Sequence, residues 1–275
     1  MKFLKKLIFS LIRKNYYFFD KIYFNFFLFL KGEVQTNNTN EDFEEFFETR
    51  FLEFKNDYKE YYKTIEKEKF KNIAITSSID LPASNDRSNF NHGIILHNLL
   101  DNFIKNNNRN FEILEIGTSR GYTSLCMSQA LLDNKDSSKI ISLDVIHNNK
   151  KFFQKTYLGN KKVSRLEILE NISFELLKNI NFIQADSYTD LKKIIFHNLR
   201  FAYIDGEHTF KYLIKELKYC NESLLKGGMI VVDDYNEKDF SDVVKCVHFF
   251  SDKYNYNLEI IKYGYDSNFA VLNKN

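Results

Sequence analysis

The segment Phe111–Leu132, which reads FEILEIGTSRGYTSLCMSQALL, constrains the fold more than any other part of the chain. Its β-rich first residues predict a strand that ends at Glu115, and its second half predicts a helix. Gly117 and Gly121 lie between the two, where glycine lets the backbone turn tightly and pass close to a ligand. A strand, a glycine turn and a helix in this order predict an α/β sheet that binds a ligand at its strand ends.

The rest of the C-terminal part extends this pattern. Short β-rich runs alternate with helical stretches after Ser77, which indicates a parallel sheet built from βαβ units. The predicted parallel strands are Phe111–Ile116, Ile140–Asp144, Ile180–Gln184, Phe201–Asp205 and Met229–Asp233. Two further runs, Leu258–Tyr263 and Asn268–Leu272, predict a β-hairpin. We therefore expect a Rossmann-like α/β domain over residues 77–275, preceded by a helical extension over residues 1–76.

The N-terminal extension is aromatic, and residues 1–30 are also basic. Charged side chains interrupt every window long enough for a transmembrane helix, and no small-residue cleavage site for a signal peptide follows. Two interpretations remain: an interfacial helix in peripheral contact with a membrane, or a helix that covers the core or a second subunit. From Glu41 to Lys69, apolar residues at three- and four-residue steps predict one amphipathic helix, which caps the α/β domain or forms a dimer contact.

The whole-chain composition bounds the partners and the compartment. The 275 residues carry a formal net charge of +2, which does not point to nucleic acid as a partner. The three cysteines, Cys126, Cys220 and Cys246, form no CxxC pair. An odd number of widely spaced cysteines predicts buried thiols in a reducing, cytoplasmic compartment.

The glycine turn resembles motif I of class I methyltransferases, which use S-adenosylmethionine. Its EIGTSRGYTSL wording is especially similar to metal-dependent O-methyltransferases of the catechol and caffeoyl-coenzyme A type, although Ser119 stands where many families have glycine. An acidic side chain at the strand end also suits the cationic half of that cofactor. The resemblance implies four cofactor-binding residues here: Glu115, Gly117, Thr118 and Gly121.

Polar residues at the next two strand ends extend the predicted cofactor site. Asp144 ends the second strand, roughly 25 to 30 residues after the glycine turn, where a carboxylate can accept both ribose hydroxyls. Asp186 and Ser187 follow the third strand and resemble the family position that contacts adenine, although a plain helix cap explains them equally well. Arg87 and His92 belong to a stretch, RSNFNHGIIL, that resembles the segment closing over the cofactor in related enzymes.

Three carboxylates follow the fourth and fifth strands. The fourth, FAYIDGEHTF, reaches Asp205, and the fifth, GGMIVVDDYN, reaches Asp233 and Asp234. These strand ends lie side by side in a doubly wound sheet, and three carboxylates there repel one another unless a cation or a proton intervenes. Carboxylate oxygens suit a hard ion such as Mg²⁺, which makes a bound hydroxyl lose its proton more easily. His208 follows closely and is a candidate base or metal contact, or a histidine that simply packs.

These two segments resemble the magnesium-dependent O-methyltransferases that act on antibiotic sugars, such as the macrocin O-methyltransferase family. The DGEH wording is also similar to a related group that includes cephalosporin hydroxylase-type proteins. The resemblance covers residues from about 87 to the C-terminus. It implies that Asp205, Asp233 and Asp234 hold the metal, and that the acceptor is a hydroxyl on a sugar, a glycan or another small metabolite. Asp205 and His208 are the predicted catalytic residues.

Other classes of protein fit the sequence less well. A dinucleotide oxidoreductase requires a three-glycine fingerprint, which is absent. A nucleic-acid amino-methyltransferase usually carries an Asp/Asn-Pro-Pro-Tyr loop, and the sole proline here is Pro82. We therefore expect no nucleic-acid partner. The alternative that remains is a non-catalytic, methyltransferase-like scaffold that binds a partner through its aromatic N-terminal helices; a homo-oligomer is compatible with either function.

Overall fold

The computed structural model describes residues 40–77, 90–154, 156–159, 161–264 and 266–275. Residues 38–275 form one compact unit. The predictions for residues 1–30 and for Arg87 lie outside the described residues. Within the described ranges, no helix combines the length and the apolar character that crossing a membrane requires.

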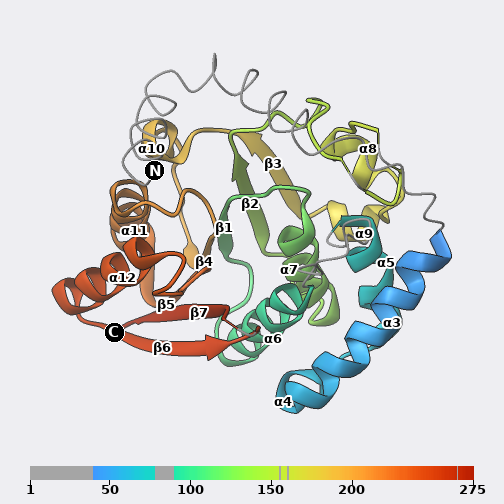
Figure 1. Cartoon of the computed structure of the whole chain (residues 1–275). Helices are drawn as coiled ribbons and strands as arrows, with labels where there is room; N and C mark the ends of the chain where they lie inside the picture. The colour runs from blue at the N-terminus through green and yellow to red at the C-terminus, as the bar shows by residue number, and fades with distance from the viewer. Residues whose placement is uncertain (1–39, 78–89, 155, 160, 265) are drawn as a thin grey trace, which may run out of the picture. The chain divides into compact units, whose positions relative to one another are not determined.

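A mixed sheet of seven strands forms the centre of the described part of this unit, in the order β3-β2-β1-β4-β5-β7-β6 (Figure 1). The strands are β1 (Glu112–Ile116), β2 (Lys139–Asp144), β3 (Ile180–Gln184), β4 (Leu199–Ile204), β5 (Leu224–Val232), β6 (Tyr256–Lys262) and β7 (Asn268–Lys274). Strands β1 to β5 pair in parallel, whereas β7 is antiparallel to both β5 and β6. The predicted parallel strands and the C-terminal hairpin are therefore confirmed.

Helices cover both faces of the sheet (Figure 1). One face carries α3 (Asn40–Asp57), α4 (Lys59–Tyr62), α5 (Lys67–Ser77), α6 (Asn91–Asn106), α7 (Tyr122–Asp133), α8 (Arg165–Leu169) and α9 (Phe174–Leu177). The other carries α10 (Ser187–Asp190), α11 (Phe210–Ser223) and α12 (Ser241–Tyr254). Side chains along β4 alternate between two cores: Phe201 and Tyr203 pack on the first face, and Ala202 and Ile204 on the second. This alternation makes central strands apolar throughout.

The single amphipathic helix predicted from Glu41 to Lys69 was wrong, because three helices occupy that region. The first break comes at Tyr58, whose backbone leaves the helical region with φ −123° and ψ 45°. The apolar spacing continues across the breaks because all three helices pack on the same core as α6. The rings of Phe47 in α3 and Phe90 before α6, for example, are 4.9 Å apart. The aromatic face therefore packs on the α/β core.

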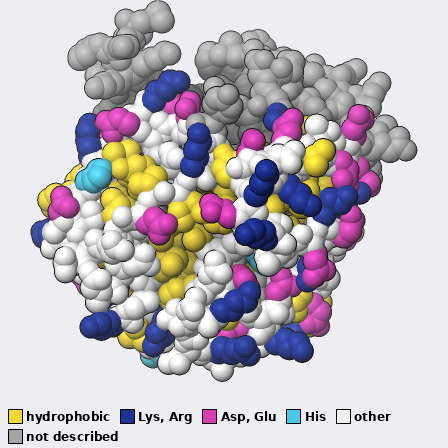
Figure 2. Space-filling model, turned by 90° about the horizontal axis from the view of Figure 1, so that it is seen from below, with side chains coloured by type: hydrophobic (Ala, Val, Ile, Leu, Met, Phe, Trp, Pro, Cys, Tyr) yellow, Lys and Arg dark blue, Asp and Glu magenta, His cyan; other side chains and the backbone are white. Residues whose placement is uncertain are grey.

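Two predictions about the remaining side chains can be checked in the fold. All three cysteines are buried free thiols, which confirms their predicted role as core residues. On the face drawn in Figure 2, acidic and basic side chains are interspersed around apolar patches. This face carries no broad region of a single charge, in keeping with the small net charge of the chain.

Candidate functional site

The carboxyl ends of β1, β4 and β5 are linked by backbone hydrogen bonds. The Asp205 amide donates to the Ile116 carbonyl at 2.8 Å, and the Asp233 amide donates to the Ile204 carbonyl at 2.9 Å. Gly117 follows β1 with φ 95°, and a Cβ at this position would lie 1.9 Å from the Asp205 carbonyl oxygen. Only glycine fits there, because a side chain would clash with backbone. The glycine turn and the first predicted metal ligand are thus in direct backbone contact.

The backbone at position 119 explains why many families have glycine where this chain has serine. Ser119 has a left-handed backbone, with φ 49°, which accounts for the preference for glycine at this position in many families. Gly121 has φ 95° and precedes the first turn of α7. Thr118 is buried, and its hydroxyl lies 2.5 Å from the Ser142 hydroxyl. The side chain of Thr118 therefore joins the turn to β2.

Glu115 lies in the core behind this turn and is fully buried. Its carboxylate accepts hydrogen bonds from the hydroxyls of Thr123, Ser124 and Ser142. Burial raises the pKa of Glu115, and the hydrogen bonds from the three hydroxyls oppose that rise. Every contact of this carboxylate in the structure is internal, so its predicted contact with a cofactor stays a prediction.

Asp144 ends β2 with both carboxylate oxygens engaged. Oδ2 accepts from the Ser119 amide and from Nη2 of Arg165, each at 2.7 Å, and Oδ1 accepts from the Ile146 amide at 2.8 Å. Arg165, in the first turn of α8, is 1% exposed, and sequence reasoning missed it. The Ser164–Glu167 capping box marks the start of that helix, but nothing in the local sequence predicts that its arginine points inward.

Asp186, which follows β3, forms the N-terminal cap of α10. The Asp186 side chain accepts from the Tyr188 amide at 2.7 Å at the start of α10, so the helix-cap interpretation describes its contact in this structure. The Ser187 hydroxyl donates to Oε1 of Glu216, a buried residue of α11 that sequence reasoning also missed. Burial raises the pKa of Glu216 to about 7, and its Oε2 has no hydrogen-bond partner in the structure.

The predicted metal ligands Asp205 and Asp234 meet at His208. One ligand atom from each of the three lies within 4.8 Å of the others. Nε2 of His208 is 3.0 Å from Oδ2 of Asp234 and 3.5 Å from Oδ1 of Asp205. These contacts suit ion pairs but are not aligned as hydrogen bonds, so Nε2 is buried without a hydrogen-bond partner in the structure. The cluster joins the loops that follow β4 and β5.

Two carboxylates beside one imidazole shift each other's proton affinity. Burial raises the pKa of Asp205, the negative charges of Asp233 and Asp234 raise it further, and His208 lowers it. Burial lowers the pKa of His208, but its contacts with Asp205 and Asp234 outweigh burial and raise the pKa to about 10. At neutral pH, therefore, His208 is protonated, and so is most of Asp205, whose pKa is about 8.

Asp233 is not part of this cluster. Its carboxylate accepts from the hydroxyl of Tyr203 at 2.5 Å, from that of Tyr263, and from the Asp234 amide at 2.7 Å. Asp234 has a left-handed backbone with φ 54°, so the two consecutive aspartates turn in different directions. The ring of His92 lies 5.9 Å from that of Tyr263. The structure thus brings together two of the three predicted metal ligands, and a metal role for Asp233 stays a prediction.

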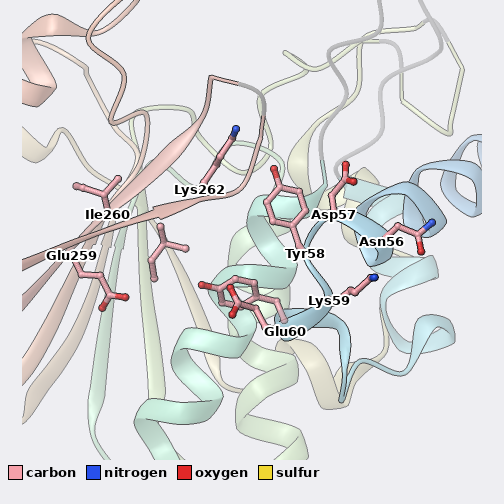
Figure 3. A pocket seen from close by; sticks show the side chains of 10 residues that line it. Asn56, Asp57, Tyr58, Lys59, Glu60, Glu259, Ile260 and Lys262 are labelled. Atoms are coloured by element: carbon pink, nitrogen blue, oxygen red, sulfur yellow. The ribbon is translucent and has the colours of Figure 1, made fainter.

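A cleft of about 600 Å³ lies elsewhere, beside β6 (Figure 3). It is lined by Asn56, Asp57, Tyr58, Lys59, Glu60 and Tyr61 and by Glu259, Ile260, Ile261 and Lys262. These residues lie where α3 ends and α4 begins, and in the last four residues of β6. None of the predicted site residues lines this cleft.

Comparison with known proteins shows which proteins this chain is similar to. Residues 114–235 match a family described as a methyltransferase domain. The O-methyltransferase NovP has a similar structure, with a TM-score of 0.53 and 17% identity over 74% of this chain and 88% of NovP. An O-methyltransferase from Bacillus cereus, in complex with S-adenosylhomocysteine, gives a TM-score of 0.50 and 16% identity over 76% of this chain and 92% of that protein.

A third similar structure is the Podospora anserina methyltransferase PaMTH1 with bound S-adenosylhomocysteine. It gives a TM-score of 0.50 and 13% identity over 80% of this chain and 94% of PaMTH1. No curated protein matches the sequence at a significant level. The structural likeness establishes a Rossmann-like class I methyltransferase fold, and residues 114–235 are similar to a methyltransferase domain.

Proposed function

We propose that this protein transfers the methyl group of S-adenosylmethionine to a hydroxyl oxygen of a sugar or another small metabolite, with the help of a divalent cation. The observation that carries the proposal is the meeting of Asp205, His208 and Asp234 beside the glycine turn. This cluster lies at the carboxyl ends of neighbouring strands, where open α/β sheets bind their ligands.

Support for the cofactor comes from the glycine turn and from the comparisons. The strand order reverses between β1 and β4, and Gly117 and Asp205 lie in contact at that point. The match to a methyltransferase domain spans this point, and two proteins of similar fold hold S-adenosylhomocysteine. On this proposal Gly117 and Gly121 allow the tight backbone turn beside the cofactor, and Asp144 accepts a hydrogen bond from its ribose.

The donor set of the cluster fits a divalent cation. Two carboxylates and an imidazole supply three ligand atoms within 4.8 Å, and the imidazole nitrogen is buried without a hydrogen-bond partner in the structure. Carboxylates favour Mg²⁺ or Mn²⁺, and an imidazole ligand favours a transition metal. When bound, such a cation lowers the pKa of an acceptor hydroxyl and so supplies a better nucleophile.

The side chains of the cluster would orient the acceptor and handle its proton. Without a cation, His208 is protonated at neutral pH, because its pKa is about 10. It can therefore accept a proton from an acceptor hydroxyl only after its own proton has left. It can do so only while Nε2 does not coordinate the cation, because a coordinated nitrogen has no lone pair for a second proton. Positioning the hydroxyl in line with the methyl group supplies a further part of the rate.

The test is calorimetric titration of the full chain with S-adenosylmethionine and with S-adenosylhomocysteine, first with Mg²⁺, then with Mn²⁺, then with EDTA. We expect binding of both ligands, and direct binding of one cation that Asp205→Asn and Asp234→Asn each weaken. Asp252→Asn, an exposed residue of α12, is the matched control and should bind the cation as the parent does. Acceptors are then screened by mass spectrometry for the addition of one methyl group.

Each outcome addresses a separate part of the proposal. Failure to bind either adenosyl ligand at millimolar concentration under all three conditions would contradict the methyltransferase assignment and favour the scaffold alternative. Adenosyl binding without any cation binding would remove the metal from the proposal and leave the cofactor in place.

A further inference from the structure

Arg165 is the largest side chain that the described core buries almost completely, at 1% exposed. It comes from α8, in the segment between β2 and β3, and the proposed metal cluster does not include it. Burying a guanidinium is costly unless charged and hydrogen-bonding partners surround it. Its partners therefore indicate what the residue does.

The guanidinium of Arg165 connects two loops of the proposed cofactor site. Nε donates to the Ser119 carbonyl at 2.6 Å, and Nη2 donates to Oδ2 of Asp144 at 2.7 Å. Nη1 donates to the Asn148 side chain and lies 3.4 Å from the Ile146 carbonyl. One rigid fork thus holds the turn after β1 and the residues after β2 in a fixed relation. Lysine, with a single ammonium, cannot make this set of contacts.

This arrangement limits what Asp144 can still accept. A carboxylate offers about four acceptor positions. Oδ2 already accepts from the Ser119 amide and from Arg165, and Oδ1 accepts from the Ile146 amide. Among the described contacts, one acceptor position remains, and it lies on Oδ1. Two neighbouring hydroxyls of a ribose cannot both bind at one position.

We infer that Arg165 is a positioning residue of the cofactor site, which orients Asp144 so that its carboxylate accepts one ribose hydroxyl rather than two. The inference rests on the proposed function, because it assumes an adenosyl ligand at this strand end. It differs from the sequence-based expectation that Asp144 accepts both ribose hydroxyls. It also assigns a role to the segment between β2 and β3, from which α8 delivers the arginine.

The test compares three ligands: S-adenosylhomocysteine and its 2′-deoxy and 3′-deoxy analogues. For the parent protein, we expect one deoxy analogue to bind about tenfold more weakly or worse, since a hydrogen bond to a charged group is lost, and the other to bind nearly as the parent ligand does. For Arg165→Lys, we expect weaker binding of all three and loss of the discrimination between the two analogues. Arg200→Met, at the opposite end of β4, is the control and should retain the parent pattern.

The outcomes separate the inference from the proposed function. If the parent protein binds none of the three ligands, both fail. If it binds S-adenosylhomocysteine but loses affinity equally for the two analogues, the single-hydroxyl inference fails and the proposed function stands. If Arg165→Lys keeps the parent affinity and discrimination, the positioning role fails. The comparison of the two deoxy analogues uses the parent protein alone. It therefore shows how many ribose hydroxyls Asp144 accepts even if Arg165→Lys does not fold.

Discussion

On the β1–β2 side of the sheet edge, Glu115 and Asp144 each accept three hydrogen bonds from hydroxyls, amides or Arg165. On the β4–β5 side, Asp205 and Asp234 share one imidazole, whose nitrogen is aligned with neither. The four carboxylates lie at the ends of adjoining strands of one sheet. They differ in how many hydrogen bonds they accept from the protein.

The difference indicates that the carboxylates on the two sides of this edge have different roles. Carboxylates that accept three hydrogen bonds from the protein stabilise the fold and hold the backbone of the proposed cofactor site in place. Carboxylates that repel each other across a poorly aligned imidazolium are costly, and proteins keep such groups chiefly where a ligand will complete them. The protein itself satisfies the carboxylates of the β1–β2 side, and the β4–β5 side is the one proposed to bind a cation.

The largest effect is expected at the point where the two sides meet. Gly117→Ala places a Cβ 1.9 Å from the Asp205 carbonyl oxygen and should lower the free energy of unfolding by about 4 kcal/mol or more, or prevent folding. Gly159→Ala is the matched control, because Gly159 has nearly the same φ, 94°, but no atom within 4 Å of the added carbon. Urea denaturation compares the two variants. Equal losses would mean that backbone strain alone, and not contact between the two sides, explains the glycine.

An intermediate effect is expected at Glu216, whose carboxyl is satisfied on one oxygen only. Its pKa is raised from 4.5 to about 7, so its stabilising contribution is complete below pH 4.5 and is lost as the pH rises through 7. Glu216→Gln removes this dependence. Between pH 5 and pH 8 the parent should lose up to about 3 kcal/mol more unfolding free energy than the variant.

Denaturation of both proteins at the two pH values measures this difference, since the groups that they share cancel. A parent and a variant that change in parallel with pH would show that Glu216 keeps its charge in the folded state. It would then belong with the carboxylates of the β1–β2 side.

The smallest effect compares two isosteric substitutions, one from each side. Glu115→Gln leaves a buried hydroxyl without its charged acceptor and should cost about 2 kcal/mol of unfolding free energy. Asp205→Asn removes a carboxylate whose charge is opposed by burial and by its neighbours, and should leave the melting temperature unchanged or raise it. Thermal denaturation without added metal measures both. Destabilisation by both variants to the same extent would remove the distinction between the two sides.

Much of the fold could be predicted from the sequence because its signals are local. The central strands β1 and β4 are runs whose residues are mostly buried on both faces, and the hairpin appears as two runs around Gly264. The breaks between α3, α4 and α5 could not be predicted, because helices that pack on one core keep the same apolar spacing across a change of direction. Only the backbone of Tyr58 and the residues after Tyr62 mark the breaks.

The candidate site was predicted in part for a similar reason. Topology alone brings Asp205 and Asp234 to one edge, because parallel strand ends meet there. One hydrogen bond of Asp233 comes from Tyr263, which follows β6 and approaches only when the hairpin is added to the sheet. Arg165 and Glu216 carry no local signal for burial, since charged residues on helices are usually exposed.

By itself, then, the sequence determined the order of strands and helices, the glycine turn and the edge at which the acidic residues gather, because each follows from residue spacing and strand direction. The tertiary structure alone decided which carboxylates are satisfied. Hydrogen-bond partners of Glu115, Asp144 and Asp233 come from segments distant in sequence, and side-chain direction is set by packing. These hydrogen-bond partners separate the carboxylates that stabilise the fold from those proposed to bind a cation.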